Sequence, residues 1–300
     1  MKTILKKIYK SLPFKKEIYS LIRSIYSPPN SIYKHLHFNG PFLVNIDDTR
    51  AFKMTHFGFY IENEIFWNGL YNGWEKFSLK IWSEMCEGSE VILDIGANTG
   101  IYALIGKTIS PGSKVLALEP VQRVFDRLVA NVELNRMDIV CLKKAASNFI
   151  GTAEIFDKDS DHTYSVTVNK DLSEDPENSI KTTIETTTLD HLIEEYSLTK
   201  IDIIKIDVET HEAEVLEGFA NFISLFQPDM LIEILNDEVA ENIESQISQM
   251  NYLYFNIDEK KGVRQVASLS KSDHFNFLIC KPSSVKSILS LSHLEISLSK

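Results

Sequence analysis

Cysteine is scarce in this sequence, and its spacing argues against covalent or metal cross-links. The 300 residues contain three cysteines, Cys86, Cys141 and Cys280, which lie far apart and form no C-x-x-C pair. A disulfide framework or a zinc site needs closely grouped ligands, so we expect neither. Cys141 and Cys280 lie in apolar runs typical of strands, where a thiol behaves as a small buried hydrophobic group.

Long apolar runs and an excess of basic residues are also missing. No stretch approaches the roughly 18–20 uninterrupted apolar residues of a spanning helix, so we expect no membrane span. Lys6, Lys7 and Lys10 interrupt any signal-peptide core, and a cytoplasmic protein is the expectation. The 42 acidic and 31 basic side chains give a net charge of −11. Because nucleic-acid binding usually needs a basic face, we expect no nucleic-acid partner.

The basic residues that are present concentrate near the start of the chain. Residues 1–37 hold eight lysines and arginines and one acid, Glu17. Apolar residues recur there at helical spacing, over 1–12 and again over 14–25. A basic amphipathic segment suits an anionic membrane surface, which predicts peripheral contact through residues 1–27, at the inner face of the membrane. The alternative is a helical cap that packs its apolar face on the rest of the protein.

The order of apolar segments predicts an α/β fold. Short strands and turns are expected over 41–68, including a strand at 58–61, and a helix over 74–87. Strands then alternate with helices, which predicts a parallel, doubly wound sheet, and the last two strands lack a helix between them, so one should be antiparallel. The expected strands are 91–95, 114–118, 139–142, 152–156, 182–187, 201–206, 230–234, 252–257 and 274–279, and the expected helices are 99–107, 121–135, 211–223 and 238–249.

The turn after the strand at 91–95 has the composition of a nucleotide-cofactor site. Its residues Asp94, Gly96, Asn98 and Gly100 lie between a strand and a helix. Glycine lets the backbone approach a ligand, and a helix start offers free amide donors. Asn98 replaces the second glycine of the dinucleotide fingerprint, and Asp94 would repel a pyrophosphate. A cationic cofactor without phosphate, such as S-adenosylmethionine, therefore suits this turn better than NAD.

A second acid completes the expected cofactor site. Glu119 ends the strand at 114–118, 23 residues beyond Gly96, where a carboxylate can accept both hydroxyls of a ribose. Each acid also has an ordinary alternative, with Asp94 as a helix cap and Glu119 facing solvent. Their order on the predicted elements favours the cofactor site.

With these motifs, the chain resembles FkbM-type S-adenosylmethionine-dependent methyltransferases over about residues 90–280. The segment containing K-I-D-V-E is the most specific, and Thr210 stands where the family often has glycine. The resemblance implies a Rossmann-like, seven-stranded, mostly parallel sheet with a reversed last strand, and methylation of an oxygen on a sugar or other small metabolite. It rests on VILDIGANTGIYAL (91–104), LALEP (116–120), VANVELN (129–135), AAS (145–147), TLD (188–190), IDIIKIDVETHEAEVLEG (201–218) and MLIEI (230–234).

The resemblance also divides the chain. We expect a methyltransferase domain over residues 89–282 and a C-terminal tail over 283–300. A basic helical segment over 1–40 and a cap or substrate region over 41–88 precede it. The polar, acidic loop at 157–181 has the length of a functional lid or a disordered insert.

The acceptor is expected at the end of the strand at 201–206, beside Asp207, Glu209, His211 and Glu212. His211 has an ordinary pKa near 6.5, suited to a general base. The three acids are alternative bases or, together, oxygen ligands for a divalent cation. Two side chains in this segment have structural alternatives. Lys205 would form an ion pair with a neighbouring carboxylate, and Glu212 would be a first-turn acid that stabilises the helix dipole.

Three further residues have two readings each. Glu233 closes the next strand at the same edge of the sheet, and its role is either functional or structural. Trp74 and Glu75 either cover the cofactor or belong to the core.

Two other functions also compete with the methyltransferase. One is an inactive scaffold of the same fold at a membrane, and the other is a nucleotide-cofactor oxidoreductase, which Asp94 and Asn98 disfavour.

Overall fold

The computed structural model of the protein describes residues 13–158, 179–285 and 288. The chain divides into two compact units, Met1–Trp74 and Glu75–Lys300. Within the described ranges, no helix combines the length and the hydropathy needed to cross a membrane. The helix expected over 1–12, most of the loop at 157–181 and most of the tail at 283–300 lie outside the described residues.

From residue 13 onward, the first unit contains a β-hairpin and three helices. The hairpin strands pair antiparallel, and the helix expected from the apolar spacing at 14–25 is confirmed. The strand expected at 58–61 is wrong, because Tyr60 and Ile61 begin a helix whose next six residues are buried. The elements are α2 (Lys15–Ile25), α3 (Asn30–Tyr33), β1 (Gly40–Asn45), β2 (Ala51–His56) and α4 (Tyr60–Asn68).

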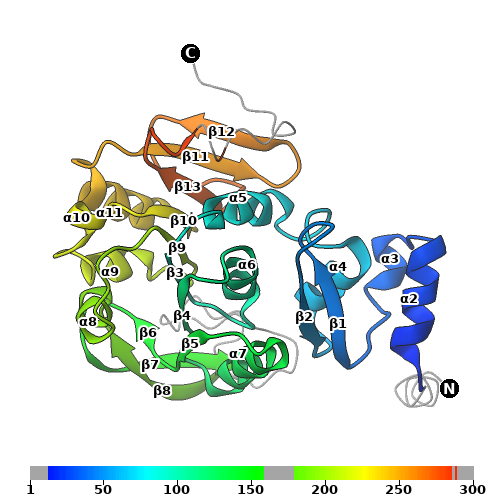
Figure 1. Ribbon diagram of the computed structural model, residues 1–300. Helices are drawn as coiled ribbons and strands as arrows, with labels where there is room; N and C mark the ends of the chain where they lie inside the picture. The colour runs from blue at the N-terminus through cyan, green and yellow to red at the C-terminus, as the bar shows by residue number, and fades with distance from the viewer. Residues whose placement is uncertain (1–12, 159–178, 286–287, 289–300) are drawn as a thin grey trace. The chain divides into compact units, whose positions relative to one another are not determined.

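The second unit is built on one large sheet (Figure 1). In the described chain this sheet has eight strands, in the order β12-β11-β13-β10-β9-β3-β4-β5. The strands are β3 (Val91–Ile95), β4 (Lys114–Leu118), β5 (Ile139–Leu142), β9 (Ile203–Ile206), β10 (Asp229–Glu233), β11 (Leu253–Asp258), β12 (Gly262–Val266) and β13 (Asn276–Cys280).

The strand directions confirm the doubly wound prediction. β5, β4, β3, β9 and β10 are parallel to their neighbours in this series, and β13 is antiparallel to both β10 and β11. The additional strand β12 pairs with β11 at the edge of the sheet. β12 was not predicted, because the residue pattern of a short, partly polar edge strand resembles that of a loop.

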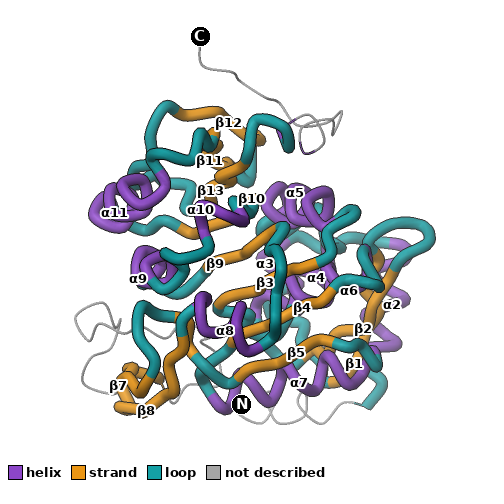
Figure 2. The backbone as a smooth tube through the Cα atoms, turned by 60° about the vertical axis from the view of Figure 1, so that its left-hand side comes forward, coloured by secondary structure: helices purple, strands orange, loops and turns teal. Residues whose placement is uncertain are grey.

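Helices cover both sides of this sheet, with α9 and α11 on one side and α5 and α6 on the other (Figure 2). The helix expected over 211–223 is two helices, because the chain turns at Gly218. A Cβ at Gly218 would lie 2.0 Å from the Ser147 carbonyl oxygen, so only glycine fits this approach. The helices are α5 (Lys76–Cys86), α6 (Ile101–Ile109), α7 (Gln122–Asn135), α8 (Leu189–Glu195), α9 (Glu212–Glu217), α10 (Ile223–Phe226) and α11 (Asp237–Ile247).

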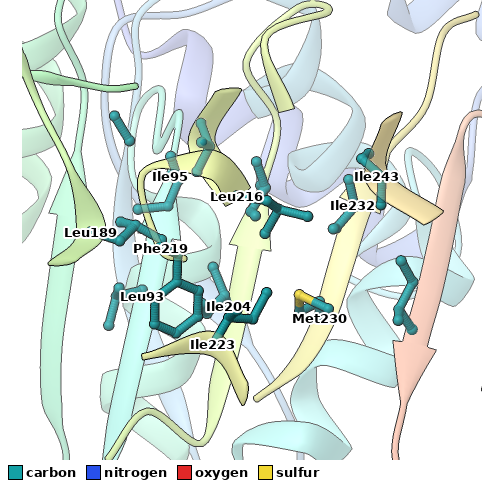
Figure 3. Packing of buried hydrophobic residues seen from close by; sticks show 14 of the residues in the cluster. Leu93, Ile95, Leu189, Ile204, Leu216, Phe219, Ile223, Met230, Ile232 and Ile243 are labelled. Carbon is teal, nitrogen blue, oxygen red and sulfur yellow. The ribbon is translucent and has the colours of Figure 1, made fainter. Parts of the chain in front are cut away.

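The main apolar core lies between the sheet and helices α8 to α11. Leu93, Ile204 and Met230 point from the strands toward Leu216 and Phe219 (Figure 3). Neighbouring residues of a strand point to opposite faces, so Asp94 and Lys205 lie on the other face.

A small sheet accompanies the large one. Its strands are β6 (Ala145–Ala146), β7 (Gly151–Lys158) and β8 (Ser179–Thr187), in the order β6-β8-β7. β7 and β8 pair antiparallel, which confirms the strands expected at 152–156 and 182–187. Ile155 and Ile184 pack with Val121 and Val124 of the α7 region, which holds the small sheet beside the end of β4.

Candidate functional site

The turn after β3 lies directly against the ends of two neighbouring strands. The N–H groups of Gly96 and Ala97 donate to the Leu118 carbonyl oxygen at 3.0 and 2.8 Å. Gly96 has φ +78°, and a Cβ there would lie 1.9 Å from the carbonyl oxygen of Asp207. Only glycine can occupy this position. The turn therefore ties together the ends of β3, β4 and β9.

Asn98 and Glu119 meet at the ends of β3 and β4. The backbone N–H of Asn98 donates to Glu119 Oε2 at 3.1 Å, and Val121 N–H donates to Glu119 Oε1 at 2.9 Å. Burial raises the pKa of Glu119 to about 7, although these two hydrogen bonds act against the rise. Among the described residues, the buried Asn98 Oδ1 has no hydrogen-bond partner. An unpaired buried acceptor in a native fold calls for a donor from elsewhere, and a ligand is one source.

Asp94 is almost fully buried at this edge of the sheet. Its side chain is 1% exposed, and Oδ2 accepts a hydrogen bond from the Ala103 N–H at 2.9 Å. Burial raises the pKa of Asp94 to about 7, while this hydrogen bond and the charge of Lys205 lower it. The observed contact is that of an acid holding the first turn of a helix.

The helix that follows the turn is anchored by a contact that the sequence did not indicate. The buried side chain of Asn131 on α7 donates through Nδ2 to the Thr99 carbonyl oxygen at 2.9 Å. Gly100, directly before α6, adopts φ +91° and lies beside Leu128, which is also on α7. The only sequence signal for Asn131 was a polar residue on the apolar face of a helix.

At the end of β9, a buried lysine pairs with a carboxylate. Lys205 is 1% exposed, and its Nζ lies 3.1 Å from Asp207 Oδ2 and 5.3 Å from the centre of the Tyr102 ring. Burial lowers the pKa of Lys205, but the charges of Asp207, Glu75 and Glu233 outweigh it and the pKa is raised. Lys205 is therefore a cation, and Asp207 keeps 31% of its side chain exposed.

The loop after β9 is strained, and Glu212 holds it. Glu209 and Thr210 have φ of 55° and 79°, a region that a β-branched residue such as threonine adopts only at a cost. Glu212 is fully buried, and its Oε1 accepts from the N–H groups of Val208 and Thr210 at 3.1 and 3.3 Å. Burial raises the pKa of Glu212 to about 7.

His211 contacts the segment after β6 and its own helix, α9. Its Nε2 lies 3.0 Å from Ser147 Oγ, just after β6, and its Nδ1 lies 3.5 Å from Glu214 on its own helix. Burial lowers its pKa. These contacts engage both ring nitrogens away from Asp207, and the general-base role of His211 stays a prediction.

Polar side chains from the residue before α5, from α6 and from β13 complete the edge. Tyr102 Oη donates to Glu75 Oε2 at 2.5 Å, and Asn276 Nδ2 donates to Glu75 Oε1 at 3.2 Å. Asn276 is also the ladder partner of Glu233. Tyr102 and Asn276 were not predicted, because Glu75 and Asn276 are separated by 201 positions in the chain and only the topology brings them together.

The carboxylates of this edge do not form an obvious metal cage. Among the described residues, no group of three or more His, Cys, Asp or Glu side chains is arranged to hold a metal ion. Burial and the charge of Asp207 raise the pKa of Glu233, which Lys205 lowers only in part. The edge is therefore rich in acids, with Lys205 as the cation buried among them.

A doubly wound sheet with a glycine turn after its first strand and an acid after its second defines a nucleotide-cofactor protein of the Rossmann-like class. Residues 94–254 match the family described as "Methyltransferase FkbM domain". The chain belongs to this FkbM methyltransferase family, which confirms the resemblance drawn from the motifs.

Two proteins similar in sequence are named as methyltransferases. Hexuronic acid methyltransferase AglP of Haloferax volcanii is 31% identical over 147 residues, which are 49% of this chain and 57% of AglP. Methyltransferase sdnD of Sordaria araneosa is 29% identical over 155 residues, 42% of this chain and 59% of sdnD. The chain thus spans less than two thirds of either relative. The crystal structure of methyltransferase FkbM from Methylobacillus flagellatus KT matches with a TM-score of 0.40 and 15% identity, covering 64% of this chain and 44% of that one.

Proposed function

We propose that this protein transfers a methyl group from S-adenosylmethionine to a hydroxyl oxygen of a saccharide or other small-molecule acceptor. The observation that carries the proposal is the pairing of Asn98 with Glu119 beside the glycine turn. The pair offers a buried carboxylate and a buried amide oxygen that no described residue contacts by a hydrogen bond. Family membership supports the reaction type.

The residues at this edge suit the cofactor's chemistry. S-adenosylmethionine has an ammonium and a sulfonium group, which the acids at the ends of β3 and β9 favour. Asp94, Gly96, Asn98 and Gly100 would hold its methionine end, and Glu119 would accept its ribose hydroxyls. When bound, the cofactor supplies an electrophilic methyl group. The same acids would repel the pyrophosphate of NAD, which argues against the oxidoreductase alternative.

We assign the acceptor to the end of β9, where Asp207, Glu209, His211 and Glu212 lie. Asp207 is partly exposed and has Lys205 beside it, so it can orient a hydroxyl group and accept its proton. Glu209 is the second candidate base, and Glu212 shapes the loop that carries both. His211 would act only after leaving Ser147. We infer that residues 41–88 contribute to acceptor selection, because specificity commonly lies outside the shared fold.

The name of AglP, a hexuronic acid methyltransferase, directs the first test to sugars. The protein is incubated with methyl-labelled S-adenosylmethionine and a panel of saccharides with and without hexuronic acids. We expect label in a saccharide, and none with Asp207→Asn or Glu209→Gln, while both variants still bind S-adenosylhomocysteine. Full turnover by both variants would remove the two acids from the mechanism.

We also propose that the basic start of the chain contacts an anionic membrane. In α2, Ile18, Leu21 and Ile25 are 48%, 66% and 80% exposed, whereas Tyr19 on the other side is buried. An exposed apolar stripe on a helix with basic residues suits such a surface. In vesicle flotation, the protein should bind anionic vesicles, and Leu21→Glu should release it. Equal behaviour of both forms with neutral and anionic vesicles would contradict this contact.

A further inference from the structure

Among the described residues, no cation is in direct contact with the Glu75 carboxylate, although the charge of Lys205 acts on it. Asp207 pairs with Lys205 at 3.1 Å, whereas the hydrogen-bond partners of Glu75 are the neutral groups of Tyr102 and Asn276. Burial raises the pKa of Glu75 to about 7, whereas the charge of Lys205 and these two hydrogen bonds lower it. The two donors therefore favour the ionised carboxylate and fix its orientation. In the part of the chain that the structure describes, this carboxylate is thus held in place without a cation in direct contact.

Accessibility separates Glu75 from Asp94. Asp94 is 1% exposed and already accepts a hydrogen bond from helix α6, so it acts on a ligand through its charge. Glu75 keeps partial exposure. Beside it, the Asn276 Oδ1 is buried and, among the described residues, without a hydrogen-bond partner. The Glu75 carboxylate and the unpaired amide oxygen beside it offer two acceptors to a group with several N–H donors.

The acids around Lys205 also favour a cationic ligand at this edge. Glu75, Asp94, Asp207 and Glu233 lie around Lys205, so among the described residues the acids outnumber the cations here. Buried like charges destabilise one another unless a counter-charge joins them. The described acids are not arranged for a metal ion, and an organic ammonium group meets the same need with directional hydrogen bonds.

We infer that Glu75, oriented by Tyr102 and Asn276, binds the α-ammonium group of the cofactor's amino-acid part. The inference rests on the proposed function, since it assigns a further contact in the same site. Glu233 is the competing acid. It lies on the same edge but has no hydrogen-bonded donors among the described residues to orient it, so the structure favours Glu75 for a directional contact.

Two ligands separate this contact from a general effect on the site. S-adenosylhomocysteine has the amino-acid part, and 5′-methylthioadenosine has the same nucleoside without it. Calorimetry should show that Glu75→Gln weakens S-adenosylhomocysteine binding by about tenfold to a hundredfold, the effect of losing one charged hydrogen bond. Binding of 5′-methylthioadenosine should stay within about twofold of the wild type. Glu75→Gln can preserve both existing hydrogen bonds, because the Asn276 amide can turn to accept from the introduced amide group.

Controls make each outcome decisive. Glu119→Gln should weaken both ligands, because both contain the ribose, and Glu233→Gln should weaken neither by more than about threefold. Tyr102→Phe, which removes one orienting donor, should weaken S-adenosylhomocysteine alone, and this variant decides the question if Glu75→Gln does not fold. Equal loss of both ligands in Glu75→Gln, or no loss of either, overturns the inference. A wild-type protein that binds neither ligand contradicts the proposed function itself.

Discussion

Alternate residues of β9 face two chemically different regions, and the contrast shows how one strand serves both stability and ligand binding. Ile204 and Ile206 belong to the apolar core under helices α8 to α11. Lys205 points to the opposite face, among Asp207, Glu75 and Glu233. Burial of the apolar side stabilises the fold, whereas burial of the acids on the other side costs free energy until a counter-charge arrives. Changes to the two sides should therefore have separable effects.

The largest expected effect is on the apolar side. Phe219 is fully buried between the sheet and the helices, so Phe219→Ala should lower the free energy of unfolding by about 3–5 kcal/mol. Affinity of the folded protein for S-adenosylhomocysteine should not change. Urea unfolding and calorimetry measure the two quantities, and Leu225→Ala, at a side chain 72% exposed, is the control with little expected change. Loss of affinity in folded Phe219→Ala would show that the two sides are not separable.

At the glycine turn we expect the opposite, a larger effect on ligand affinity than on stability. Gly96→Ala places a Cβ 1.9 Å from the Asp207 carbonyl oxygen, so the turn must move away from β9. We expect about a hundredfold loss of S-adenosylhomocysteine affinity, which corresponds to roughly 2.7 kcal/mol. Gly112→Ala is the matched control, since a Cβ there meets nothing within 4 Å. Unchanged affinity in Gly96→Ala would separate this turn from the cofactor site.

The stability of the protein and its ligand affinity should also depend on pH, because of the acids on the charged side of the sheet. Burial raises the pKa of Asp94 and Glu119 to about 7 in the folded protein. Their ionisation as the pH rises through 7 therefore lowers the stability of the ligand-free protein, while the ammonium group of a bound ligand favours the ionised acids. From pH 8 to pH 6 we expect the ligand-free melting temperature to rise and S-adenosylhomocysteine affinity to fall about tenfold. Glu119→Gln should make both profiles less steep, while Asp94 still titrates in this range. Affinity that does not vary with pH contradicts the charge assignment.

The smallest effect is expected at the loop after β9. Thr210 has φ of 79°, where glycine is free of strain, so Thr210→Gly should raise the free energy of unfolding by about 1 kcal/mol. The affinity for S-adenosylhomocysteine should stay the same. Thermal unfolding measures the gain, with Thr108→Gly in helix α6 as the opposite control. Destabilisation by Thr210→Gly would mean that the threonine side chain holds the loop.

The sequence alone predicted the parts of this molecule that depend on local order. The alternation of apolar strands and helices predicted the sheet and its reversed strand, and the turn from Asp94 to Gly100 could be placed because it follows a strand directly. Local pattern failed at Tyr60 and Ile61, where helical packing decides, and at β12, which is short and partly polar. The grouping of Glu75 with Asn276 depends on contacts between distant segments, and one sequence has no signal for those.

The most direct test of the account is calorimetric titration of the wild-type protein with S-adenosylhomocysteine at pH 8, with NADH as the comparison ligand. The account predicts saturable, micromolar binding of S-adenosylhomocysteine and none of NADH. Binding of NADH, or no binding of S-adenosylhomocysteine, would contradict the assignment of the acidic edge to a cationic cofactor. The second result would favour a methyltransferase fold that serves as a scaffold.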